Sequence, residues 1–266
     1  MEDQPLHESS GASDASFTPP PSDMPWHQGF LTILTAPYQL GRSYFQPRVY
    51  PIMVGILLNV LLSILTSYVM TSNPDILNEV FQQAKRSIEA VTNYLPEDQV
   101  EEMIDQTWER LSTFSLTSAT FQGVVSGVLG IFLPAVVFWI LYRLTTAEMP
   151  PFLLIANFVG FAQSIIFIGG ILNAITMYFA GSLRYGTSLL LFTSDITRLS
   201  PLTFSLLNQV ELFSIWSYIA AGVATSGLLG YSRGRGIVYG IIVYALKLLV
   251  IAIPALLVQM FRQMVS

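Results

Sequence analysis

The chain has 266 residues, of which 52% are hydrophobic and only 11% charged, and its net charge is -5. Soluble globular domains carry about 25% charged residues, so this composition indicates a protein whose solvent is lipid. The absence of cysteine excludes disulfides, thiolate metal sites and thiol nucleophiles. The twelve basic residues are spread singly or in pairs, which excludes the basic patch of a nucleic-acid-binding protein.

The N-terminal part of the chain is polar. Residues 1–25 are rich in Ser, Pro, Asp and Glu, and they have too little apolar surface to offset the entropy of ordering, so we expect a disordered tail. This stretch lacks the basic start and apolar run of a cleavable signal, so the first span is expected to direct insertion. In residues 26–48 apolar side chains recur at helical spacing around Pro37 and Gly41, which predicts a short helix in the membrane interface.

Five apolar segments are long enough to cross a bilayer, whose core takes about 20 helical residues to span. They cover residues 49–70, 120–142, 152–180, 212–231 and 237–260. The short connection between the last two predicts a tight antiparallel hairpin. Another uncharged run, residues 185–194, is too short to cross and is expected to lie along the surface or re-enter partway. The sequence therefore predicts an all-α, polytopic membrane protein with five transmembrane helices.

The loop between the first two spans, residues 72–112, holds nine of the seventeen acidic residues. Two helix starts are visible in it, because Asn73 precedes a proline and an acid, and Pro96 precedes two acids. Apolar residues recur at helical spacing after each start. We therefore expect an acidic, amphipathic helical hairpin outside the lipid.

The orientation of the spans follows from the basic residues near their ends. A cytoplasmic N-terminus places one more of these residues inside than outside, although the bias reverses if Lys85 and Arg86 are counted. We choose the cytoplasmic N-terminus, which puts the acidic hairpin on the outer or lumenal side.

Lys247 lies eleven residues into the fifth predicted span, near the bilayer midplane. A cation costs about 2.5–3.5 kcal/mol there on insertion scales, so Lys247 is a candidate for a role in transport or binding. The alternative interpretations are structural burial and snorkelling of its side chain. The predicted span ends put Glu211 and Lys247 at depths that differ by about 12 Å, and Lys247 leans away from Glu211. A polar partner from another span is therefore expected instead. The candidates are Asn59, Asn157, Gln163 and Asn173.

Small residues recur at intervals of three or four in two predicted spans. They are Gly123, Ser126, Gly127 and Gly130 in the second span and Ala220, Ala221, Ala224 and Gly227 in the fourth. Such faces favour close helix packing over a ligand channel. The spacing of the glycines at 234, 236 and 240 is similar to that of a dinucleotide-binding loop, but no strand precedes them, so no cofactor is expected.

The residue inventory argues against catalysis. His7 and His27 both precede the first span, and no span contains a histidine or an acid that might serve as a general base. Glu101 and Glu102 are adjacent, but their helix has the pattern of a solvated acidic face. We therefore predict a protein without an enzymatic, metal or cofactor site.

One region carries the pattern of a known family. An acidic residue precedes a Phe-Ser-x-Trp sequence at the head of the fourth span. The residues concerned are Glu211, Phe213, Ser214 and Trp216, flanked by residues 199–203 and the basic turn 233–235. With the Ala36-Pro37 segment, the Pro-rich stretch before the first span and the run from Thr187, this pattern resembles the prokaryotic branch of the Yip1 domain family over residues 26–262.

The resemblance implies a five-span protein with a cytosolic N-terminus. Eukaryotic members of the family act in vesicle traffic and associate with Rab-type GTPases, but their Asp-Leu-Tyr-Gly-Pro motif is absent here, where residues 45–51 occupy the comparable region. A Rab-type partner is therefore not expected. The resemblance favours a prokaryotic protein of the cytoplasmic membrane. Two hypotheses follow: a non-enzymatic component that organises lipids, membrane-protein partners or copies of itself, or a transporter or lipid-moving protein with a polar cavity around Lys247.

Overall fold

The computed structural model describes residues 24–92, 96–145 and 151–265. The predicted disordered tail therefore lies outside the described residues, except for its last two positions. Within the described ranges the chain is helical, with one isolated antiparallel bridge between Ser188 and Glu211. The structure is thus an all-helical one, as the hydropathy pattern predicts.

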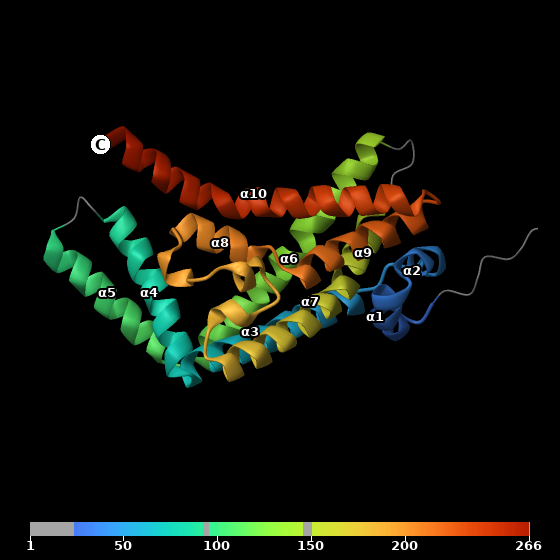
Figure 1. The fold of residues 1–266 in the computed structure, drawn as a ribbon. Coiled ribbons are helices and arrows are strands. Elements are labelled where there is room, and N and C mark those ends of the chain that lie inside the picture. Colours follow the sequence, from blue (N-terminus) through green and yellow to red (C-terminus); the bar gives the residue numbers. More distant parts are fainter. Residues whose placement is uncertain (1–23, 93–95, 146–150, 266) are drawn as a thin grey trace, which may run out of the picture.

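The helices follow one another with short connections (Figure 1). Their order is α1 (Trp26–Thr35), α2 (Pro37–Ser43), α3 (Tyr50–Ser72), α4 (Pro74–Val91), α5 (Glu97–Ser112), α6 (Leu116–Thr145), α7 (Phe152–Ala180), α8 (Pro201–Gln209), α9 (Leu212–Leu228) and α10 (Arg233–Val265), with short 3-10 turns η1 (Leu183–Tyr185), η2 (Leu189–Phe192) and η3 (Ile196–Arg198) between α7 and α8. Four segments are long and apolar enough to cross a membrane: α3, α6, α7 and residues 233–253 of α10. A fifth apolar helix, α9, has 17 residues.

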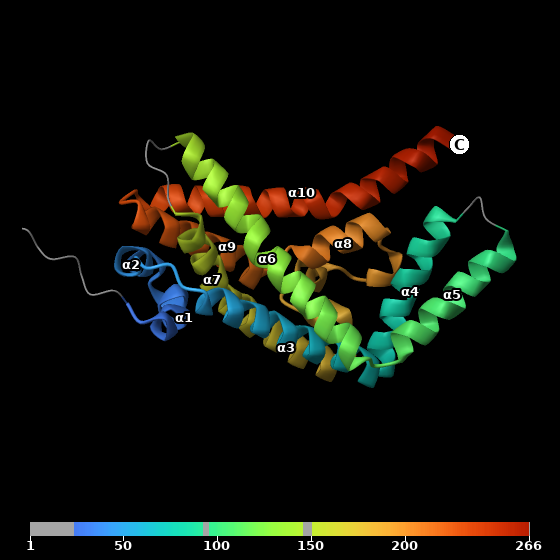
Figure 2. The same ribbon diagram turned by 180° about the vertical axis from the view of Figure 1, so that it is seen from behind.

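Helix α7 is the centre of the fold. In its most apolar stretch 72% of the residues are buried, against 17–28% in the other three long apolar helices. Helices α3 and α6 run beside it in both views (Figures 1 and 2), and α9 packs against it as well. Large apolar side chains such as Leu57, Leu133 and Ile241 point away from the core. A surface of this kind is suited to lipid.

The predicted small-residue face of α6 contacts α3 at two of its three glycines. A Cβ atom built on Gly123 would lie 2.5 Å from the Cα of Val60, and one on Gly127 would lie 3.0 Å from the Cα of Ile56. No atom lies within 4 Å of a Cβ built on Gly130. Close packing therefore explains the first two glycines. At Gly130 there is room for a side chain, although the Gly130 carbonyl accepts a hydrogen bond from Gln163 Nε2 of α7 at 3.3 Å.

Helices α9 and α10 form an antiparallel pair that also approaches through glycines. A Cβ on Gly222 would overlap the carbonyl oxygen of Gly236, and one on Gly240 would lie 2.6 Å from the Cα of Ile219. Helix contact thus explains Gly236 and Gly240, whereas a Cβ atom on Gly234 would meet nothing within 4 Å. Our prediction placed the start of this last helix at Ile237, whereas α10 begins at Arg233.

The segment before the first span differs from the predicted single interfacial helix. It forms two helices that meet at Ala36 and Pro37, where proline lacks the N–H that a continuous helix needs. Helix α2 lies directly on α9, since a Cβ on Gly41 would overlap the carbonyl oxygen of Ala224. The Tyr38 hydroxyl donates a hydrogen bond to the Tyr231 carbonyl at 3.0 Å. This segment is part of the protein core.

Asn157, fully buried in α7, anchors the chain that leads into α3. Its Oδ1 accepts from the Arg48 N–H at 2.9 Å and the Tyr44 hydroxyl at 3.2 Å, while its Nδ2 donates to the Arg48 carbonyl at 2.6 Å.

Replacing Asn157 with Ala leaves the Arg48 backbone groups without this partner, so we expect a loss of about 2 kcal/mol in the free energy of unfolding. Chemical unfolding in detergent measures it. The control Asn78→Ala changes an exposed residue of α4 and is expected to have no effect on the free energy of unfolding. If Asn157→Ala is as stable as Asn78→Ala, Asn157 does not anchor the chain before α3.

Candidate functional site

Glu211 lies at the centre of a polar network just before α9. Its Oε1 accepts hydrogen bonds from Asn173 Nδ2 and, at 3.0 Å, from Thr187 Oγ1. Its Oε2 accepts from Ser214 Oγ at 3.0 Å. These donors come from α7, from the connection after α7 and from the first turn of α9. The carboxylate therefore joins three separate parts of the chain.

The backbone around Glu211 is fixed as well. The Leu212 N–H donates to the Thr187 carbonyl at 3.3 Å, and the Leu189 N–H donates to the Val210 carbonyl at 3.0 Å. The Thr187 N–H donates to Asn173 Oδ1 at 2.6 Å. The uncharged run 185–194 thus includes η2 and lies against the start of α9, where Leu190 is fully buried.

Lys247 projects from α10 towards two aromatic rings. Its Nζ lies 5.6 Å from the ring centre of Tyr218 and 5.8 Å from that of Tyr244, which is within the range of cation–π attraction. Glu211 is close enough to attract it electrostatically. Among the described residues, no carboxylate oxygen lies within 4.0 Å of this nitrogen.

The expected amide partners of Lys247 are engaged elsewhere. Asn157 binds Arg48, Asn59 donates to Gln163 at 3.0 Å, and Asn173 donates to Glu211. The prediction of an amide partner is therefore wrong, and so is the large depth difference between Glu211 and Lys247. Since α9 ends at Leu228 and α10 begins at Arg233, Glu211 lies 17 residues before the turn and Lys247 14 residues after it. The remaining offset is about 4.5 Å.

The two aromatic residues of the sequence pattern lie apart from this network. Phe213 packs on α7 at Gly169, where a Cβ atom would overlap its ring. Trp216 is 41% exposed and borders a hollow of about 390 Å³ between α2, α9 and α10, together with Tyr38 and Arg233. The structure therefore brings Glu211 and Lys247 together and places Phe213 and Trp216 on other faces.

A cavity of about 330 Å³ lies beside Glu211, between α3, α4, α7 and α8. Glu211, Asn173, Asn208 and Gln83 supply most of its polar lining. Sequence reasoning missed Gln83. It lies three residues after Val80 and seven after Ile76, so helical spacing places it on the apolar face of α4, and this spacing is the signal that could have found it. What covers that face becomes visible only once α4 is packed against the connection that follows α7.

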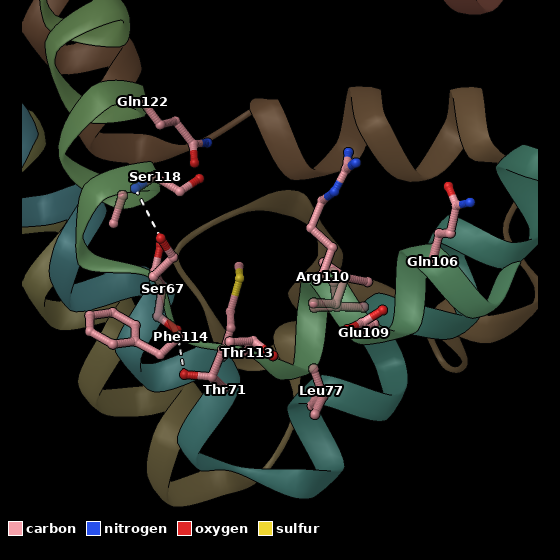
Figure 3. Close-up of a pocket in the computed structure, with 15 residues that line it drawn as sticks. Ser67, Thr71, Leu77, Gln106, Glu109, Arg110, Thr113, Phe114, Ser118 and Gln122 are labelled. Carbon is pink, nitrogen blue, oxygen red and sulfur yellow. Dashed lines mark hydrogen bonds between the residues drawn. The ribbon is translucent and has the colours of Figure 1, made fainter. Parts of the chain in front are cut away.

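A second hollow, of about 870 Å³, separates the pair α4 and α5 from the ends of the long helices (Figure 3). Arg110 extends into it from α5, and Gln122 and Ser118 border it from α6. The two short helices are held together by the rings of Phe81 and Trp108, whose centres are 4.8 Å apart. Within the part of the chain that the structure describes, no group of three His, Cys, Asp or Glu side chains is placed to hold a metal ion.

Comparison with protein families gives one result. The model of the Yip1 domain matches residues 31–253, a range that begins in α1, ends in α10 and includes the Glu211 network. Comparisons with curated proteins and with solved structures gave no match. The match covers most of the chain, and the apolar helices agree with it. The chain is a multi-pass membrane protein that belongs to the Yip1 domain family.

Proposed function

We propose that this protein is a five-span, non-enzymatic component of a prokaryotic cytoplasmic membrane that organises protein partners through the pair α4 and α5. The observation that carries the proposal is the exposure of α5, which has no buried residue among its sixteen. Helix α5 lies at the outer edge of the molecule in both views, with α4 between it and α8 (Figures 1 and 2). An exposed outer helix beside a hollow is suited to contact with another protein.

The five-span count is supported by the position of α9 in the bundle, packed against both α7 and α10. Phe213, in its first turn, packs on α7 at Gly169, and Gly227, in its last turn, lies against the Tyr38 carbonyl of α2. Helix α9 is about 25 Å long, which is close to the thickness of a bilayer core. A short turn then reverses the chain into α10, so the two helices form an antiparallel pair. In this arrangement the acidic pair is on the outer side when the N-terminus is cytoplasmic.

The absence of catalysis is supported by the state of Glu211. Both of its carboxylate oxygens accept hydrogen bonds from the protein, which suits a structural anion better than a proton-transfer group. The alternative of transport around Lys247 has no comparable support, because Lys247 packs on two tyrosine rings and does not line the cavity beside Glu211.

The partner is expected to present a basic surface, because α5 is acidic over most of its length. The exposed acids on it are Glu97, Asp98, Glu101, Glu102, Asp105 and Glu109. Opposite charges across an interface speed association and select partners.

Neutralising α5 tests this proposal. We expect replacement of its six acids by Gln or Asn to abolish recovery of a specific partner from native membranes solubilised in neutral detergent, while the thermal unfolding temperature stays unchanged. Quantitative mass spectrometry of the purified complex measures the recovery. The control Glu101→Asp, Glu102→Asp keeps the charge and should keep the partner, as should the unmodified chain. Unchanged recovery after neutralisation, or after deletion of residues 75–109, would exclude the role of this pair.

A further inference from the structure

We propose that the cavity beside Glu211 binds the primary ammonium group of an amphiphile. This site is separate from the surface of α4 and α5 on which the proposed function rests. It has three features that together select such a ligand: a buried acceptor without a partner, a fixed carboxylate, and an apolar wall.

The unpartnered acceptor is Gln83 Oε1. The Gln83 side chain is 7% exposed, and its Nε2 donates to the Ile196 carbonyl at 2.6 Å. This bond fixes the orientation of the amide, because turning it over would bring two oxygens together. Its Oε1 is buried and has no hydrogen-bond partner among the described residues. Buried acceptors of this kind destabilise a fold unless a donor reaches them, and Gln83 lines the cavity.

The carboxylate is Glu211. A carboxylate presents about four lone-pair sites, and the protein supplies three donors to it, so one site remains. Lys247, which Glu211 attracts, is not among the residues that line the cavity. The polar end of the cavity is therefore rich in acceptors and has a negative charge. A primary ammonium fits it, since this group has three donors and a positive charge.

The remaining wall of the cavity is apolar. Leu62 and Met70 come from α3, Ile166 and Met177 from α7, and Phe204 from α8. Met70 and Met177 lie in the last turns of α3 and α7, whereas Leu62 and Ile166 lie near the middle of these helices. The cavity therefore extends from the helix ends, where the headgroups of a bilayer lie, into the apolar part of the bundle. A volume of about 330 Å³ lies within the range of small-ligand sites, which begins at roughly 300 Å³. The ligand is thus an alkylamine or a lipid with an ethanolamine headgroup.

The experiment uses the full chain in neutral detergent and follows thermal unfolding by tryptophan fluorescence. The probes are decylammonium, decyltrimethylammonium, short-chain phosphatidylethanolamine and short-chain phosphatidylcholine. We expect a concentration-dependent rise in unfolding temperature with the probes that have N–H donors and none with their trimethylated counterparts. A rise with decylammonium alone assigns the site to free amines, and a rise with phosphatidylethanolamine assigns it to a lipid. An equal rise with an N–H probe and its trimethylated counterpart, or no rise with any probe, would overturn the proposal.

Two variants connect the effect with this cavity. Gln83→Met removes the unpartnered acceptor and is expected to weaken the apparent affinity for the ammonium probe about tenfold or more, because a hydrogen bond to a charged group is lost. The neighbouring Gln82→Met does not alter the cavity and should bind as the unmodified chain does. Glu211→Gln, which removes the charge, should weaken binding further. If Glu211→Gln does not fold, Gln83→Met decides alone: affinity equal to that of Gln82→Met refutes the site. None of these variants alters α5, so the outcome is independent of the partner test.

Discussion

Replacing Glu211 with Ala is expected to lower the free energy of unfolding by about 3 kcal/mol or more. The substitution removes the acceptor of Asn173, Thr187 and Ser214 and takes away a carboxylate that attracts Lys247. Glu211→Gln keeps one oxygen acceptor in place and should lose less. Chemical unfolding in detergent micelles measures both variants against the unmodified chain.

A double-mutant cycle with Lys247→Met isolates the part of this loss that comes from the two charges. We expect Glu211→Gln and Lys247→Met together to cost less than the sum of the single variants, because the pair of neutral side chains leaves no isolated charge near the tyrosines. Strict additivity would show that Glu211 and Lys247 do not interact and would leave Lys247 stabilised by Tyr218 and Tyr244 alone.

The second large effect is expected from Gly41→Ala, which should cost about 3 kcal/mol although it adds one methyl group. The new Cβ would overlap the backbone oxygen of Ala224, and backbone atoms of a packed helix do not move aside as a flexible side chain does. Helix α2 therefore has to shift away from α9, which disturbs the buried Leu40 and Tyr44. The measurement is the midpoint of unfolding in detergent.

Gly130→Ala is the matched control for this glycine. A Cβ atom at Gly130 meets nothing within 4 Å, and alanine favours a helix over glycine by up to about 1 kcal/mol, so this variant should be neutral or more stable. A Gly41→Ala variant as stable as Gly130→Ala would contradict the close approach of α2 and α9.

The hydropathy of the sequence is sufficient to predict the apolar helices, because a run of uncharged residues has few alternatives in lipid. It does not fix their ends to better than a few residues. The expected difference in depth between Glu211 and Lys247 depends on these ends. Moving the start of the last helix from Ile237 to Arg233 and the end of α9 to Leu228 brings the two charges to nearly the same depth.

The contacts between distant segments were beyond prediction for a different reason. An apolar face indicates that a helix is buried without indicating what covers it, so the sequence of residues 26–48 does not show that α2 packs on α9. For Gln83, helical spacing indicates the inner face of α4 but not the Ile196 carbonyl that its amide binds. The spacing of Gly236 and Gly240 in α10 is informative only when the opposing backbone of α9 is known.

The contact of α2 with α9 has a consequence for the order in which the chain is assembled. Gly41 and Ala224 touch although 183 residues separate them, so the N-terminal helices are synthesised long before their binding surface exists. During translation the side of α2 that bears Leu40 and Tyr44 has to be accommodated by lipid or by the insertion machinery. Helix α2 therefore leaves the ribosome before α9 and can reach its final place only after α9 has been made.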